Sequence, residues 1–292
     1  MAATKPMAIA SLLSGAVVWG IIWYPYRLLE QAGIGGAFSS FLTYGGSLLL
    51  CLFFIHKVEW RKIESPWLLL AIALSAGWTN LAYVLAVIHG EVMRVLLLFY
   101  LAPLWTILFA RILLMERLRI HGYLIVFLSI TGAIVMLWRP QLGLPVPANG
   151  AEWLGLSAGV TFALSNVLSR RAQNIEVAVK SMSVFFGAAV LSGLALAVLP
   201  NPVPIPLLFE PRILMLVAIT VFFIFAVTLT VQYGLSHAPA NQAIVIFLFE
   251  LVVAALTSWW LVGERMSLQE WIGGLLIVAA SLFSGEMEER GV

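Results

Sequence analysis

The stretch "IVIFLFELVVAALTSWWLVGERM", residues 244–266, decides the fold because it resembles an earlier segment of the same chain. That segment, "LLLFYLAPLWTILFARILLMERL" at 96–118, aligns with it without gaps, so Phe99 matches Phe247. The pair Glu116-Arg117 at its end likewise matches Glu264-Arg265. Each copy is apolar for most of its length and reaches the ~20 residues that a helix needs to cross a bilayer. The chain therefore carries a duplicated membrane span.

The whole composition agrees with a membrane protein. The 292 residues are 62% hydrophobic and 10% charged, whereas soluble domains carry about 25% charged residues. The long apolar runs are 8–29, 38–56, 66–88, 94–115, 120–138, 153–169, 181–199, 212–235, 242–262 and 269–285. These runs are continuous and do not alternate as barrel strands do. We therefore predict an all-α polytopic membrane protein with ten transmembrane helices.

The lysines and arginines predict the orientation of these helices. With a cytoplasmic N-terminus and ten spans, eleven of them face the cytoplasm and five face outward. The cytoplasmic set is Lys5, Lys57, Arg61, Lys62, Arg111, Arg117, Arg119, Arg170, Arg171, Lys180 and Arg290, and the outward set is Arg27, Arg94, Arg139, Arg212 and Arg265. This excess agrees with the positive-inside rule. Both termini are expected to be cytoplasmic.

The duplication extends beyond the opening stretch. "SGAVVWGIIWYPYR" (14–27) aligns with "AGVTFALSNVLSRR" (158–171), and Tyr83 matches Tyr233. We predict two five-helix repeats, residues 1–138 and 152–292, joined by an external, proline- and glycine-rich linker at 139–151. Since five is odd, the second repeat must insert upside down, an architecture common in secondary transporters.

An early tryptophan in "WGIIWYPYR", a proline in the fourth span and a closing "ER" resemble the drug/metabolite transporter superfamily, specifically its EamA-type members. The aromatic-rich first half is most similar to its aromatic amino-acid exporters. The resemblance implies a ten-helix basket, with a cavity formed by the first four helices of each repeat. It places the fifth and tenth helices at the periphery. Leu251 stands where the first repeat has Pro103. This difference leaves open whether the two repeats, as the two gates of the cavity, move in the same way.

Aromatic and polar residues within the spans are the candidates for substrate contact. Buried hydroxyl and indole N–H groups need a partner that lipid cannot provide, although helix–helix packing explains the aromatic residues equally well. The candidate substrate-binding residues are Trp19, Trp78, Asn80, Tyr83, Tyr100, Asn166, Gln242, Phe247 and Glu250. The small residues of "GLSAG" (155–159), by contrast, favour close helix packing over binding.

Glu250 is the most costly of these residues, since a charged residue at the centre of a span costs ~2.5–3.5 kcal/mol. Its carboxylate must be protonated, paired or facing water. One interpretation is a neutral acid that is hydrogen-bonded to a neighbouring helix. The other is a group that faces a cavity and contacts substrate or a proton. Ala102 occupies its place in the first repeat, and this asymmetry favours the functional interpretation.

Two prolines inside spans are candidate hinges. Pro25 leaves the Ile21 carbonyl without its helical donor, and Pro103 does the same to Phe99. Each break is either a static kink or a hinge. For Pro103, three residues after Tyr100, we favour a hinge with a carbonyl that a substrate ammonium can reach.

The leading hypothesis is an inner-membrane secondary transporter that exports amino acids, aromatic or large apolar, by alternating access around a midplane cavity. The alternative is a broad-specificity exporter of other small metabolites or drugs. The sequence lacks H-E-x-x-H, G-x-x-x-x-G-K-[ST] and G-x-S-x-G, which disfavours an enzyme. It also lacks charged rings or a carbonyl filter, which disfavours a channel. We expect no cofactor, metal or nucleic acid, and a monomer whose partners are the lipid bilayer and a small-molecule substrate.

Overall fold

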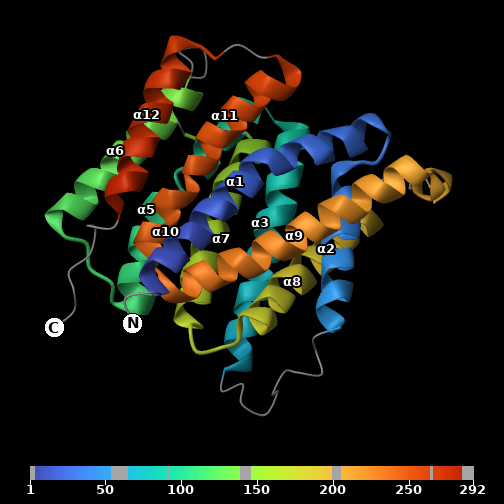
Figure 1. Cartoon of the computed structure of the whole chain (residues 1–292), viewed down its shortest axis with the longest axis horizontal. Coiled ribbons are helices and arrows are strands. Elements are labelled where there is room, and N and C mark those ends of the chain that lie inside the picture. The colour runs from blue at the N-terminus through green and yellow to red at the C-terminus, as the bar shows by residue number, and fades with distance from the viewer. Residues whose placement is uncertain are drawn as a thin grey trace.

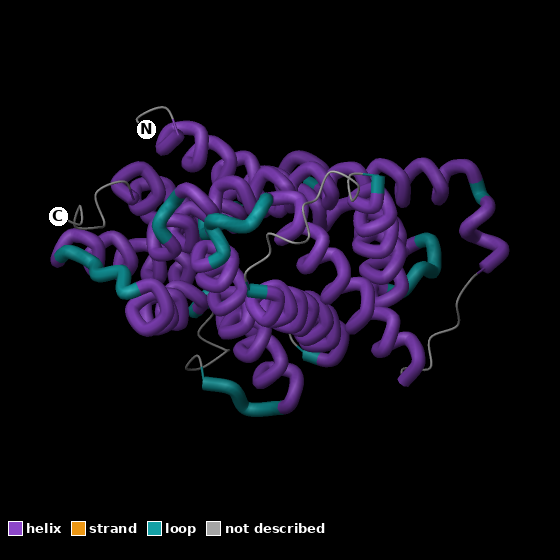
Figure 2. Tube along the Cα trace, turned by 90° about the horizontal axis from the view of Figure 1, so that it is seen from below, coloured by secondary structure: helices purple, strands orange, loops and turns teal. Residues whose placement is uncertain are grey.

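The structure is a computed structural model that describes residues 4–53, 65–90, 92–138, 146–198, 205–263 and 266–284. All regular secondary structure in these ranges is helical (Figure 2). The helices are α1 Thr4–Gln31, α2 Gly36–Leu52, α3 Pro66–His89, α4 Val92–Phe99, α5 Ala102–Phe109, η3 Ala110–Leu114, α6 Ile120–Leu137, α7 Gly150–Arg171, α8 Val177–Val198, η5 Ile205–Phe209, α9 Pro211–His237, α10 Ala240–Phe247, α11 Phe249–Val262 and α12 Leu268–Phe283.

In the part of the chain that the structure describes, every predicted apolar run falls on one of these helices or on a consecutive set of them. Within the described residues, seven helical segments are long and apolar enough to cross a membrane, and α2 and α12 are shorter apolar helices. The remaining run lies in α7, which has 22 residues but carries charged residues at both ends, Glu152 at its start and Arg170 and Arg171 in its last turn. Gly150 and Ala151, at the end of the predicted linker, already belong to α7.

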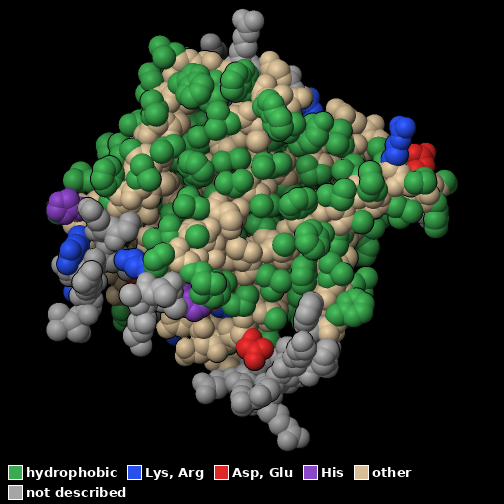
Figure 3. All heavy atoms as spheres, in the orientation of Figure 1, with side chains coloured by type: hydrophobic (Ala, Val, Ile, Leu, Met, Phe, Trp, Pro, Cys, Tyr) green, Lys and Arg blue, Asp and Glu red, His purple; other side chains and the backbone are tan. Residues whose placement is uncertain are grey.

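The broad face of the molecule in Figure 3 is covered by hydrophobic side chains. Charged side chains on this face lie at its edges, at the lower left, the bottom and the upper right. A continuous apolar band between charged ends is the surface that a bilayer requires.

The fourth and ninth runs are each interrupted near the middle. α4 ends at Phe99 and α5 begins at Ala102, which follows from the missing N–H of Pro103 in the first turn of α5. α10 ends at Phe247 and α11 begins at Phe249, although no proline is present there. The Leu251 N–H instead donates to the Leu248 carbonyl at 3.1 Å, which tightens the turn.

The two interruptions fall at equivalent positions of the aligned repeats, after Phe99 and after Phe247. The sequence predicted the first break from its proline but did not predict the second. Pro25, in contrast, lies inside α1, which continues as one helix from Thr4 to Gln31. Pro25 therefore does not divide its helix, and its role as a hinge stays a prediction.

Helices from the two halves of the chain pack against each other in matching pairs. α3 packs against α7 and α8, and α9 packs correspondingly against α1 and α2. α6 and α12 lie side by side at one flank of the bundle (Figure 1). Their backbones approach closely at two glycines, because a Cβ on Gly273 would lie only 2.6 Å from the Gly132 carbonyl oxygen.

The predicted close packing at residues 155–159 is confirmed. A Cβ on Gly159 would lie 2.5 Å from the Phe99 carbonyl oxygen, and a Cβ on Gly155 would lie 3.0 Å from the Val95 side chain. α7 therefore lies directly against α4 where that helix ends.

We expect Gly159→Ala to lower the free energy of unfolding by about 1–3 kcal/mol, because the added methyl overlaps a backbone oxygen. Thermal unfolding of purified protein in detergent measures the change. Gly45→Ala is the matched control, since a Cβ there meets nothing within 4 Å. Equal melting temperatures for the two variants would contradict the close contact.

Candidate functional site

A chain of aromatic rings connects the two helix breaks. The Tyr100 and Phe99 ring centroids are 5.2 Å apart, and those of Tyr83 and Phe99 are 5.3 Å apart. Phe99 lies 5.4 Å from Phe162, which lies 5.9 Å from Phe247. The rings come from α3, the end of α4, α7 and α10. Contacts at these separations stabilise aromatic pairs, so the rings form one apolar wall.

Glu250 lies beside this wall, in the first turn of α11. The Tyr100 hydroxyl is placed to donate a hydrogen bond to its carboxylate, and Tyr83 lies within electrostatic range of both groups. We call Glu250, Tyr100 and Tyr83 together the Glu250 cluster. It unites residues from α3, the first helix break and the second helix break, so it joins the two halves of the chain.

Gly20 of α1 completes the surroundings of Glu250. A Cβ on Gly20 would lie 2.9 Å from the Glu250 carbonyl oxygen. α1 thus lies against the second break as α7 lies against the first. Because both breaks are held by a glycine of a neighbouring helix, the positions of Tyr100 and Glu250 depend on that packing.

Trp78 and Asn80 lie on the neighbouring part of α3 and make contacts between helices. The Trp78 Nε1–H donates to Ser157 Oγ at 3.2 Å, and Ser192 Oγ donates to Asn80 Oδ1 at 3.3 Å. Thr79 and Thr161 join the same interface with their hydroxyl oxygens 2.8 Å apart. These bonds connect α3 to α7 and α8.

Trp19 packs elsewhere, against a cluster that contains Tyr44, Phe185 and Ile224. The structure therefore places it among α2, α8 and α9 side chains, and apart from the aromatic chain at the breaks. Its contribution to a substrate site stays a prediction.

Asn166 and Gln242 are buried on α7 and α10. Within the described residues, Asn166 Nδ2, Gln242 Nε2 and also Trp105 Nε1 have no hydrogen-bond partner. Their helices α7, α10 and α5 pack against one another. Leaving a buried donor unpaired costs about 1–3 kcal/mol, so these side chains are suited to bind an oxygen acceptor.

Pro103 is buried at the start of α5, and the Phe99 carbonyl that it leaves without a helical donor is in contact with another helix. The close approach of Gly159 to the Phe99 oxygen means that α7 covers this carbonyl. Substrate access to the oxygen therefore requires that α7 move away from α4.

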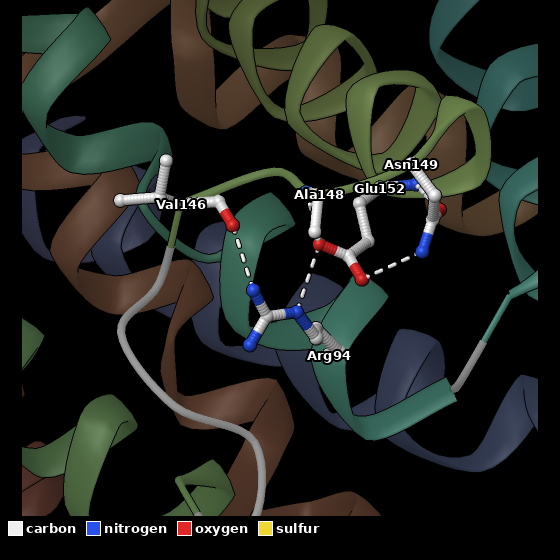
Figure 4. A network of polar contacts seen from close by, with 5 residues as sticks. All are labelled: Arg94, Val146, Ala148, Asn149 and Glu152. Carbon is white, nitrogen blue, oxygen red and sulfur yellow. Dashed lines mark hydrogen bonds and ion pairs between the residues drawn. The ribbon is translucent and has the colours of Figure 1, made fainter.

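A buried ion pair joins α4 to the start of α7 (Figure 4). Arg94 Nε lies 2.8 Å from Glu152 Oε2, and the Arg94 and Glu152 residues are only 9% and 4% exposed. Arg94 also donates to the Val146 carbonyl at 2.7 Å. The Ala148 N–H and the Asn149 amide each donate to Glu152 at 2.8 Å. Arg94, one of the five arginines predicted to face outward, is thus paired with a carboxylate inside the protein.

A second polar network links the region after η3 to the α10 start. Glu116 accepts from the Ala240 N–H at 3.1 Å and lies 3.6 Å from Arg170. Arg170 donates to the Ser236 carbonyl at 2.6 Å. Lys180 is fully buried and donates to the Ser236 hydroxyl. We call these five residues the Glu116 network. It connects the first repeat to four helices of the second, α7, α8, α9 and α10.

Sequence reasoning missed several residues that organise the site. Phe99 carried a signal, its alignment with Phe247, whereas Phe162 carried none beyond being aromatic. Glu152 follows Asn149 at the spacing of a helix N-cap, and Asn149 Oδ1 accepts from the Glu152 N–H at 3.0 Å. Its pairing with Arg94 could be found only from the tertiary contact. Glu264 and Arg265 lie outside the described residues.

No group of three or more His, Cys, Asp or Glu side chains suited to a metal occurs in the described part of the chain. The site is built from aromatic rings, hydroxyls, amides and one carboxylate. Such groups bind an organic molecule that has both an apolar part and a polar part.

The membrane-length helices, with an ionisable cluster between two broken helices, define a multi-pass membrane protein of the transporter class. The model of the EamA-like transporter family matches residues 6–138 and again residues 149–285. The chain belongs to this family, so the protein is a membrane transporter and, at the level of the family, not an enzyme. The predicted drug/metabolite transporter membership is thereby confirmed.

Three similar proteins are uncharacterised transporters. That of Pseudomonas aeruginosa, PA0485, is 30% identical over 55% of this chain, and the match spans about half of its length, 53%. One from Archaeoglobus fulgidus is 25% identical over 74% of this chain and 75% of its own. YwfM of Bacillus subtilis is 23% identical over 92% of this chain and 93% of its own.

A solved crystal structure shares the fold, with a TM-score of 0.74, 19% identity and 97% coverage of both chains. None of these proteins links the chain to the bacterial aromatic amino-acid exporter YddG, so the resemblance to aromatic amino-acid exporters stays a prediction. The substrate is therefore a matter of proposal.

Proposed function

We propose that the protein exports amino acids, aromatic or large apolar, across a bacterial inner membrane by alternating access. The Glu250 cluster and the aromatic chain between the helix breaks form the substrate site. The carboxylate of Glu250 binds the substrate ammonium, and the rings of Phe99, Phe162 and Phe247 contact its side chain. Asn166 and Gln242 supply donors for the substrate carboxylate.

The observation that carries this proposal is the position of Glu250. An ionisable side chain at membrane depth usually marks a transport pathway, and transporter sites commonly lie where discontinuous helices meet. Here the carboxylate stands at one break and faces a tyrosine hydroxyl at the other.

The proposed topology has ten spans in two inverted five-helix repeats, with both termini cytoplasmic. Three observations support it: the family model matches both halves, the breaks fall at equivalent positions, and the helix contacts occur in matching pairs. In this arrangement α6 and α12 stay at the periphery while the other helices rock around the Glu250 cluster.

A panel of labelled amino acids in proteoliposomes tests the substrate. We expect saturable, stereoselective uptake and counterflow of tryptophan, phenylalanine or methionine, measured with and without a pH gradient and against empty liposomes. Flux without saturation would point to a channel. No amino-acid flux, together with movement of other metabolites or drugs, would overturn the amino-acid substrate and favour the broad-specificity alternative.

A further inference from the structure

A small pocket lies away from the Glu250 cluster, at the start of α10. It has a volume of about 110 Å³ and lies between α5, η3, the residues that follow η3, α6 and α10. Its lining residues are Ile107, Arg111, Glu116, Arg117, Leu118, Tyr123 and Asn241. We call it the Arg111 pocket.

The charges around the Arg111 pocket favour an anion. Arg111 and Arg117 are both exposed, and neither has a hydrogen-bond or ion-pair partner within the described residues. Glu116 is the one carboxylate among the lining residues, and its charge is balanced by Arg170 and the Ala240 N–H. Guanidinium groups match phosphate oxygens in geometry and bind them with two parallel hydrogen bonds.

The surroundings of the pocket are apolar and face outward. Ile112, Met115 and Ile120 are 61%, 80% and 75% exposed, and they flank Arg111 and Arg117 along the chain. Tyr123, also in the lining, is an amphipathic residue of the kind found at the headgroup level. A ligand bound here contacts positive charge at one end and apolar side chains beside it. A phospholipid matches this pattern, because its anionic headgroup adjoins its hydrocarbon chains.

We propose that the Arg111 pocket binds the phosphate headgroup of an anionic phospholipid from the adjacent membrane surface. Basic pockets between membrane helices are known to bind such headgroups. The pocket combines residues of the first repeat with Asn241 of the second, so it is complete only while the α10 start lies against η3 and α6. Since a ligand stabilises the state that it binds better, the lipid favours the arrangement in which the contacts of the Glu116 network are formed.

Native mass spectrometry of the purified chain, after exchange into mixed phosphatidylglycerol and phosphatidylcholine, tests the site. We expect one phosphatidylglycerol to be retained preferentially. Because each arginine is proposed to bind the phosphate directly, Arg111→Gln or Arg117→Gln should weaken retention about fivefold, and the double variant about thirtyfold.

Arg119→Gln is the matched control, because it removes an exposed positive charge nearby that does not line the pocket. Phosphatidylglycerol retention unchanged in Arg119→Gln, with a loss in the double variant, supports the site. Equal retention in all variants would overturn it. Inorganic phosphate and glycerol phosphate form a second arm, and displacement of the lipid by either at micromolar concentration would assign the pocket to a soluble phosphate.

Discussion

Glu250→Gln is expected to lower amino-acid transport in proteoliposomes by about 10- to 100-fold at subsaturating substrate. The substitution keeps the size and hydrogen-bonding capacity of the side chain but removes its charge. A hydrogen bond to a charged group contributes about 1.5–3 kcal/mol, and its loss lowers the affinity for the substrate ammonium about 10- to 100-fold. Initial rates of labelled uptake, measured across a substrate series, report the change.

The neighbouring hydroxyl provides a graded comparison. Tyr100→Phe removes the donor that faces Glu250 and is expected to reduce transport about 2- to 10-fold, less than Glu250→Gln, because the carboxylate and its charge remain and one typical hydrogen bond contributes about 0.5–1.5 kcal/mol. Glu30→Gln, which removes an exposed carboxylate in α1, is the matched control and should transport normally. If Glu250→Gln shows unchanged flux and unchanged pH dependence, the carboxylate has a structural role only.

Breaking the buried Arg94–Glu152 pair is expected to have the largest effect on stability. Arg94→Leu leaves the Glu152 carboxylate buried without its cation, which typically destabilises by about 3–5 kcal/mol. The substitution also removes the hydrogen bond from Arg94 to the Val146 carbonyl. Thermal and denaturant unfolding in detergent measure the difference from the unmodified chain.

A double-mutant cycle separates the pair from its surroundings. Arg94→Leu/Glu152→Leu should be more stable than the sum of the single variants predicts, because no unpaired charge remains buried. The double variant should still be less stable than the unmodified chain, since Glu152 also binds Ala148 and Asn149 at the helix start. Arg212→Leu, at an exposed arginine, is the control. An Arg94→Leu variant as stable as Arg212→Leu would mean that the pair is solvated.

Much of the fold could be predicted from the sequence because each apolar run carries its own signal. A helix in lipid satisfies its backbone groups within the segment, so the runs locate α1, α3, α6 and α9 to within a few residues of their observed bounds. The glycines at 155 and 159 predicted close packing for a similarly local reason: a missing side chain is visible in the sequence itself.

The candidate site could be predicted only in part. Tyr83, Tyr100, Phe247 and Glu250 lie together, whereas Trp19 packs in a different cluster. The sequence reveals which side chains are costly in a membrane, but it does not reveal which helix they face. Polar partners far apart in the chain, such as Trp78 and Ser157, meet only because α3 lies against α7.

The duplicated stretch at 244–266 by itself determined the class of protein, a helical membrane protein of two related halves. Its composition and length suffice, because transfer of apolar side chains into lipid is favourable whatever their neighbours are. Only the tertiary structure decided that this span breaks at Leu248 without a proline and that Glu250 faces Tyr100. Both features depend on contacts with α1, α4 and α7, and such contacts are set by the shape and spacing of helices that the local sequence does not encode.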